Sequence, residues 1–268
     1  MSGPIVAMGG TEFVMRPENE ALHDYVLALA PAAMPRICLL PTASGDPQHQ
    51  ISSFHAAMDR RVCVASSVSL FRLAESDLEL EEHLEAVDVI YVTGGNMVNL
   101  MALWREHGLD RTLRQAHERG AVLCGYSAGS MCWFEAGVST GVGRPVCTEG
   151  LGLLEGSHCV HYSQDPARRG AYRKLVASGE ISAGLALDDH AAALFKDGKL
   201  VEAVSSRESS QAFRIESDGQ GGVIERKLPS RPISAAQAPP EAAVEEMRAV
   251  RRIRSPGPGI ARAPGRRR

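Results

Sequence analysis

The chain has 268 residues, of which 44% are hydrophobic and 23% are charged, and this length is sufficient for one large α/β domain. The longest apolar runs are too short to span a bilayer, and the first residues lack the basic start and apolar core of a signal peptide. Six cysteines are scattered, several among apolar neighbours. This predicts reduced, buried thiols in a cytoplasmic protein without a disulfide framework.

Charge is distributed unevenly along the chain. Residues 231–268 contain nine arginines and three glutamates, a net charge of +6 within a total of −3, so the rest of the chain carries −9. Prolines and small residues accompany these arginines. We therefore predict one folded catalytic domain over residues 1–230 and a disordered Pro/Arg-rich tail over residues 231–268, interrupted by a short helix at 241–253. The acidic body argues against a nucleic-acid-binding domain.

Short apolar runs alternate with segments of helical periodicity in the first half of the chain. Such runs between helices predict an α/β fold with a mostly parallel sheet and helices on both faces, whose ligands bind at the carboxyl ends of the strands. Shorter strands follow residue 137, with a hairpin turn at 196–199. The expected strands are 5–8, 36–40, 62–70, 87–92 and 121–124, and the expected helices are 21–30, 48–59, 78–86, 97–106 and 110–119.

A serine flanked by glycines follows the strand at 121–124, in the sequence GYSAG at 125–129. A helix is expected next, at 130–135. A strand, a serine between small residues and a helix predict a nucleophile elbow, in which a sharp turn exposes Oγ of Ser127 at the carboxyl end of the sheet. The alternative is a turn whose serine only caps the helix.

Two further strand ends carry glycine pairs. In the sequence TGGN at 93–96, glycine lets the backbone approach a ligand and leaves N–H groups free to face an anion. The N–H groups of Gly95 and of Ala128 are the candidate donors of an oxyanion hole. The pair at Gly9 and Gly10 is interpreted as a structural turn.

A serine nucleophile needs a base and a group that orients this base. His161 ends a short apolar run and fits a base held rigidly beside the serine, whereas His158 is less suitable. Asp188 and Asp189 end the apolar run at 184–187, and either carboxylate could orient the imidazole.

These motifs occur in an order that resembles the peptidase E family of serine peptidases, which includes aspartyl dipeptidases and, more distantly, cyanophycinases. The resemblance extends from about residue 4 to about residue 204 and implies a flavodoxin-like fold related to class I glutamine amidotransferases, with serine in place of their cysteine. The matching segments are 5–10, 91–96, 125–130, 150–153, 160–162 and 184–189.

The resemblance implies that Ser127 is the nucleophile and His161 the general base. It implies an acid at Asp189, and Glu135 is the second choice because relatives have been assigned an acid between the serine and the histidine. The residue after the acidic pair is usually small, and here it is His190, which could crowd the site or compete as a base. The chemistry requires neither a metal nor an organic cofactor.

Family members that prefer an N-terminal aspartate need a cation for its carboxylate. Arg168, Arg169 and Arg173 are the candidates, because guanidinium binds carboxylate in a bidentate manner. Asn96 is a further substrate-binding candidate. The expected partner is a small peptide, with a second copy of the chain as an option, and neither a membrane nor, for the body, a nucleic acid is expected.

Three other interpretations stay open. In an α/β-hydrolase-type esterase, Ser127 would act with His190 as the base and Asp165 as the acid. A non-catalytic, amidotransferase-like binding protein would keep the fold without a working triad. A zinc site is the third, although its spacing lacks paired ligands; its ligands would be Cys147, His158, Cys159 and His161.

Overall fold

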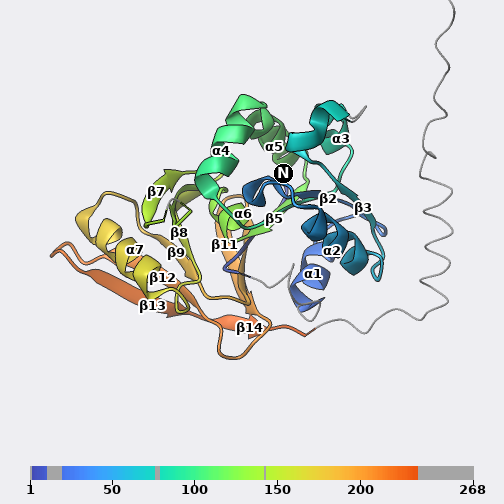
Figure 1. The fold of residues 1–268 in the computed structure, drawn as a ribbon. Coiled ribbons are helices and arrows are strands. Elements are labelled where there is room, and N and C mark those ends of the chain that lie inside the picture. Colours follow the sequence, from blue (N-terminus) through green and yellow to red (C-terminus); the bar gives the residue numbers. More distant parts are fainter. Residues whose placement is uncertain (1, 11–19, 76–78, 142, 235–268) are drawn as a thin grey trace, which may run out of the picture.

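The computed structural model describes residues 2–10, 20–75, 79–141 and 143–234 (Figure 1). Its strands within these ranges form one sheet of eight strands and one of six. The larger sheet has the order β14-β11-β10-β1-β5-β4-β2-β3, and its pairs from β1 to β3 are all parallel. Its strands are β1 (Ile5–Met8), β2 (Arg36–Leu40), β3 (Val64–Ser67), β4 (Val89–Val92), β5 (Val122–Tyr126), β10 (Ala191–Lys196), β11 (Lys199–Ser205) and β14 (Ser230–Pro232).

Helices cover both faces of this sheet, as the sequence predicts. Successive residues of a strand point to opposite faces, so fully apolar strands such as β4 supply two hydrophobic cores. Leu22, Phe54 and Met58 from α1 and α2 pack on one face, while helices α3, α4 and α5 cover the other. These helices are α1 (Glu20–Leu27), α2 (Gln48–Met58), α3 (Leu80–Glu85), α4 (Met97–Glu106) and α5 (Leu109–Glu118).

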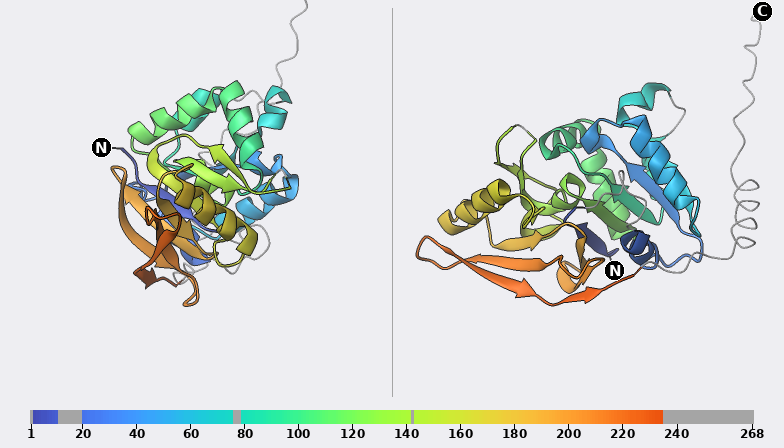
Figure 2. Two further views of the ribbon diagram at one scale, coloured as in Figure 1. Left: turned by 90° about the vertical axis from the view of Figure 1, so that its left-hand side faces the viewer. Right: turned by 60° about the horizontal axis from the view of Figure 1, so that its bottom comes forward.

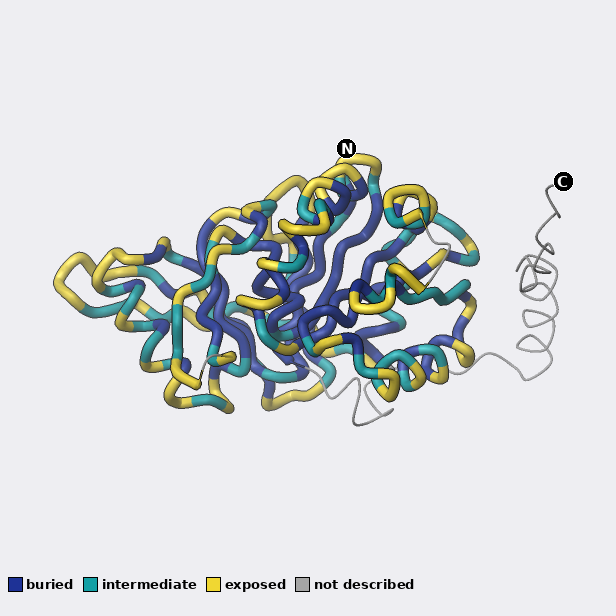
Figure 3. The backbone as a smooth tube through the Cα atoms, turned by 45° about the horizontal axis from the view of Figure 1, so that its top comes forward, coloured by how far each residue is buried: buried dark blue, intermediate teal, exposed yellow. Residues whose placement is uncertain are grey.

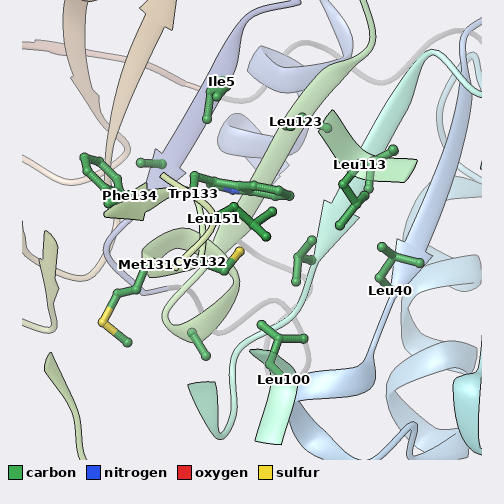
Figure 4. Packing of buried hydrophobic residues seen from close by; sticks show 14 of the residues in the cluster. Ile5, Leu40, Leu100, Leu113, Leu123, Met131, Cys132, Trp133, Phe134 and Leu151 are labelled. Atoms are coloured by element: carbon green, nitrogen blue, oxygen red, sulfur yellow. The ribbon is translucent and has the colours of Figure 1, made fainter. Parts of the chain in front are cut away.

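The buried strands form the centre of the molecule, and exposed residues concentrate in the peripheral loops and hairpins (Figure 3). The core on the α4 and α5 face includes Trp104 and Trp133, whose ring centroids are 6.1 Å apart. Figure 4 shows Met131, Cys132, Trp133 and Phe134 reaching into this core. The segment after Ser127 is therefore fixed by burial.

The second sheet, in the order β13-β12-β9-β8-β6-β7, is mixed, with a parallel centre of β6, β8 and β9. Helix α7 (Pro166–Ser178) packs against β12 and against β13, which pairs with β12 (Figure 2). The sequence indicates β9, at the apolar run 184–187, and the end of β8 before His161, but not the separate sheet that they join. The strands of this sheet are β6 (Phe134–Ser139), β7 (Val146–Glu149), β8 (Leu154–Val160), β9 (Gly184–Leu187), β12 (Ala212–Ser217) and β13 (Val223–Leu228).

Several local expectations differ from the structure. The helix expected at 130–135 is wrong: α6 is the single turn Ala128–Met131, and β6 starts at Phe134 because this residue joins the second sheet and the core. Cys147 is exposed, whereas the other five cysteines are buried, and all six are free thiols.

The boundary predicted at residue 230 falls inside β14. This strand runs through Pro232 and pairs with β11, and Arg231 forms an ion pair with Glu202. The helix expected at 241–253 and the rest of the tail from residue 235 lie outside the described residues. No helix of the described ranges is both long and apolar enough to cross a bilayer.

Candidate active site

Ser127 lies in a sharp turn between β5 and α6. Its backbone has φ 54° and ψ −119°, a conformation that residues other than glycine seldom adopt. The turn requires glycine on both sides, because a Cβ on Gly125 would lie 2.2 Å from the carbonyl oxygen of Gly129, and one on Gly129 would lie 2.4 Å from that of Val92. The hydroxyl of Ser127 therefore stands at the carboxyl end of a central strand.

His161 follows the last residue of β8 and also has a positive φ, of 53°. Its Nε2 lies 3.0 Å from Ser127 Oγ. Its carbonyl oxygen accepts hydrogen bonds from the N–H groups of Gln164 and Asp165, in the turn that leads into α7. The strand end and this turn together hold the imidazole against the serine.

Asp189 follows β9, the neighbour of β8, and its Oδ1 lies 2.5 Å from Nδ1 of His161. Burial raises the pKa of the Asp189 carboxyl, but the hydrogen bond and charge of His161, with smaller contributions from His190 and Arg168, hold this pKa below its usual range. The carboxylate is therefore ionised at neutral pH and can fix the tautomer of His161.

The preceding acid, Asp188, has a different role. It is almost fully buried, and its two carboxylate oxygens accept hydrogen bonds from the N–H groups of Ser163 and Gln211. Asp188 therefore ties the loop after His161 to the start of β12, while Asp189 turns to the imidazole. Of the two acids left open by the sequence, Asp189 is the one that contacts the imidazole of His161.

Gly10, for which the sequence predicts only a structural turn, lies beside Asp189. It forms an isolated parallel bridge with Asp189, and its carbonyl oxygen accepts a hydrogen bond from the N–H of His190. The glycine pair at the end of β1 is the sequence feature that could have indicated this position. Its relation to Asp189 depends on the sheet order, which brings β1 beside both β5 and β10.

The glycine loop after β4 lies against the serine. A Cβ on Gly94 would be 2.9 Å from the Cβ of Ser127, and one on Gly95 would be 2.1 Å from the carbonyl oxygen of Ala43. Asn96 caps α4: its Oδ1 accepts from the N–H of Asn99, and its Nδ2 donates to the carbonyl oxygen of Gly141. The side chain of Asn96 thus orders the loops at the rim of the site.

The three candidate arginines separate into two groups. Arg169 and Arg173 both form ion pairs with Glu225 of β13, at 2.9 and 2.8 Å, and Arg169 also stacks on the Tyr162 ring. Both guanidinium groups thus share one carboxylate, in a network that joins α7 to the second sheet.

Arg168 is nearly buried and lies on the His161 side of the site. Its Nη2 donates to Oγ1 of Thr140 at 2.6 Å, and its Nη1 donates to the carbonyl oxygen of Val160 at 3.5 Å. Its Nε lies 3.4 Å from Oδ2 of Asp165, without a hydrogen bond. Because its charge contributes to the lowered pKa of Asp189, Arg168 is the candidate arginine that acts electrostatically on the site.

The other candidate residues have different partners. Glu135 accepts a hydrogen bond from the N–H of Gly156, and Asp165 caps α7 by accepting from the N–H of Arg168. His190 is buried next to Asp189 with a φ of 67°. Among the described residues, His, Cys, Asp and Glu side chains form no group of three or more that could hold a metal ion.

A buried histidine, His158, contacts the helix that follows Ser127. Both ring nitrogens of His158 have partners: Nε2 lies 2.9 Å from Oγ of Ser130 in α6, and Nδ1 lies 3.0 Å from the carbonyl oxygen of Leu185 in β9. Burial, opposed by the hydrogen bond to Leu185 and aided by the nearby charge of His161, lowers the pKa of His158 to about 4. His158 is therefore neutral, donating from Nδ1 and accepting at Nε2.

Comparisons with known proteins identify the family of this chain. The model of peptidase family S51 matches residues 5–203. The uncharacterized peptidase YgaJ of Bacillus subtilis (strain 168) is 45% identical over 211 residues, which cover 79% of this chain and 91% of that protein.

Two solved structures share the fold at low sequence identity. A peptidase from an acI-B1 Actinobacterium has a TM-score of 0.60 at 17% identity, over 88% of this chain and 98% of its own. A protein assigned as peptidase E from Listeria monocytogenes EGD-e has a TM-score of 0.52 at 18% identity, over 85% and 100%. The family match and the similarity to YgaJ show that this chain belongs to peptidase family S51 and is a serine peptidase.

Proposed function

We propose that this enzyme hydrolyses short peptides by an acyl-enzyme mechanism, with Ser127 as the nucleophile, His161 as the general base and Asp189 as the acid that orients the base. The observation that carries the proposal is the continuous chain of two contacts, from Ser127 Oγ to His161 Nε2 at 3.0 Å and from His161 Nδ1 to Asp189 Oδ1 at 2.5 Å. A hydroxyl, an imidazole and a carboxylate in this order activate the hydroxyl for acyl transfer.

The reaction follows from these contacts. His161 takes the proton of Ser127 as Oγ attacks the peptide carbonyl, and the imidazolium that forms is stabilised by the ionised Asp189. The N–H groups of Gly95 and Ala128 would hold the oxyanion; Ala128 starts α6, so its N–H has no partner within the helix. His161 then protonates the leaving amine, and water attacks the acyl-enzyme to release the product.

The substrates that we propose are dipeptides with an N-terminal aspartate. A buried guanidinium on the His161 side, at Arg168, supports this choice, because it could pair with the side-chain carboxylate of the substrate. Arg169 and Arg173 are less suited, because they are more exposed and are held on Glu225 of β13. Six free thiols are consistent with a reaction in the reducing cytoplasm.

The decisive experiment compares hydrolysis of Asp-Leu, Ala-Leu and a short-chain ester by the wild type, Ser127→Ala and His161→Ala. We expect the wild type to cleave Asp-Leu with little ester turnover, and both variants to be inactive while they keep their fold. Ester hydrolysis that survives His161→Ala but requires His190 would support the esterase instead. A fully inactive wild type would support the binding protein.

Substrate recognition is tested with Arg168→Ala and the control Arg173→Ala. Loss of a charge-assisted hydrogen bond should lower the preference for Asp-Leu over Ala-Leu by about 10- to 100-fold in Arg168→Ala. The ratio is the useful quantity, because any structural damage would lower both activities together. An unchanged ratio in Arg168→Ala would remove Arg168 from substrate recognition.

A further inference from the structure

A pocket of about 530 Å³ lies beside the glycine loop, between the turn after β2 and helix α4. Its lining includes the apolar residues Ala43, Phe71, Ala102 and Leu103 and uncharged polar residues such as Thr42 and Asn96. None of the described residues that line it is ionisable. The pocket is therefore uncharged and has ample room for an apolar amino-acid side chain.

The pocket wall and the serine contact the same loop. Gly94 lies against Ser127, while the carbonyl oxygen of Ala43 in the wall accepts a hydrogen bond from the N–H of Asn96 at 2.7 Å and touches Gly95. Helix α4 then begins next to α6 (Figure 1). The pocket and Ser127 are thus connected through the glycine loop at 94–96.

An exposed aromatic residue, Phe71, lines the pocket, and a buried carboxylate holds its backbone. Phe71 has 60% of its surface exposed, which is unusual for a phenylalanine. Its N–H donates to Oδ2 of Asp46 at 3.2 Å, and Oγ of Ser69 donates to the same oxygen at 2.9 Å. Asp46 is buried and has a positive φ, of 53°. Asp46 therefore fixes the backbone at Phe71, whose exposed ring is accessible to an apolar group in the pocket.

We propose that this pocket binds the apolar side chain of the residue that follows the scissile bond, an inference that rests on the proposed function. Arg168 lies on the His161 side of Ser127, and the pocket lies on the Gly95 side. A dipeptide whose carbonyl is attacked by Ser127 extends in both directions from that atom. With the N-terminal aspartate at Arg168, the second residue reaches the pocket, and the enzyme prefers a leucine-like residue there.

The test measures kcat/KM of the wild type for Asp-Leu, Asp-Gly and Asp-Lys. Burial of the leucine side chain should favour Asp-Leu over Asp-Gly by about 10-fold or more. Ala102→Asp places a carboxylate on the exposed wall of the pocket, so the preference for Asp-Leu over Asp-Lys should fall by about 10-fold or more. The matched control is Val201→Asp, which makes the same charge change at an exposed apolar residue of β11. This strand lies near the opposite edge of the sheet from β2, so the ratios should not change.

A second measurement is independent of catalysis. In the inactive Ser127→Ala protein, saturation transfer between the leucine methyl groups of Asp-Leu and the ring of Phe71 should be observed, and Ala102→Asp should abolish it. If peptides are cleaved without preference for leucine, the pocket assignment is wrong and the proposed function stands. If nothing is cleaved but this transfer is present, the proposed function fails and the pocket stands. The absence of transfer overturns the assignment in either case.

Discussion

Gly10 packs directly against Asp189: a Cβ atom built on Gly10 would lie 1.9 Å from Asp189 Oδ1, and also 2.5 Å from Cε1 and Nδ1 of His161. Only a residue without a side chain fits at this point. The end of β1 thus forms a wall behind the contact between the acid and the base, and this wall limits where the two side chains can move.

The variant Gly10→Ala should therefore displace Asp189 and His161. Because a shift of about 1 Å in a catalytic group typically costs about 100-fold in rate, we expect kcat for Asp-Leu to fall by about that factor. The measurement is steady-state kinetics together with circular dichroism, which should show a retained fold.

The control for this variant is Gly170→Ala in α7. A Cβ at Gly170 would meet nothing within 4 Å, so activity should be unchanged. The free energy of unfolding should rise by up to about 1 kcal/mol, because alanine favours the helix more than glycine does. Equal activity of Gly10→Ala and the wild type would show that the wall is unimportant.

The identity of the acid can be tested with Asp189→Asn and Glu135→Gln. Asparagine cannot stabilise the imidazolium and favours the wrong tautomer of His161, so kcat should fall by about 1,000- to 10,000-fold. Glu135 accepts a hydrogen bond from the N–H of Gly156, which glutamine can also accept, so Glu135→Gln should change kcat by a few-fold at most. A larger loss in Glu135→Gln than in Asp189→Asn would reverse the assignment.

The buried His158 should make stability depend on pH. Its pKa in the folded protein is about 4, below the value of about 6.5 in an unfolded chain, so the folded state binds fewer protons between these values. Its contribution is therefore complete above about pH 6.5 and is lost as the pH falls toward 4. The full loss is up to about 3 kcal/mol for this pKa difference.

The matched variant is His158→Gln, whose amide can donate to the carbonyl oxygen of Leu185 and accept from Ser130 without titrating. We expect the free energy of unfolding, measured with denaturant between pH 4 and 7.5, to decline less steeply in this variant than in the wild type. Identical slopes would mean that other groups, such as the buried His23, account for the acid sensitivity.

Local sequence signals predict the central sheet well. β4 and the helix after it, α4, begin and end close to the predicted residues, because an apolar strand, a glycine turn and an amphipathic helix follow one another without interruption. The same approach fails after Ser127, where helical propensity suggests a helix at 130–135. There tertiary packing prevails, because Trp133 and Phe134 are buried and Phe134 pairs in the second sheet.

The sequence by itself determines which residues stand at strand ends: the serine between glycines, the histidine after an apolar run and the acidic pair. It also indicates a sharp turn at Ser127 that needs small residues at positions 125 and 129. These are local properties, set by steric contacts and side-chain periodicity within a few residues.

Only the tertiary structure decides which of these residues meet. The choice of Asp189 over Asp188, the contact of Gly10 with the acid and the pairing of Arg169 and Arg173 with Glu225 all join residues from different strands or helices. They depend on the order of strands in two sheets, which is set by the packing of whole cores. Local patterns do not specify that order, because one apolar strand can pair with many others.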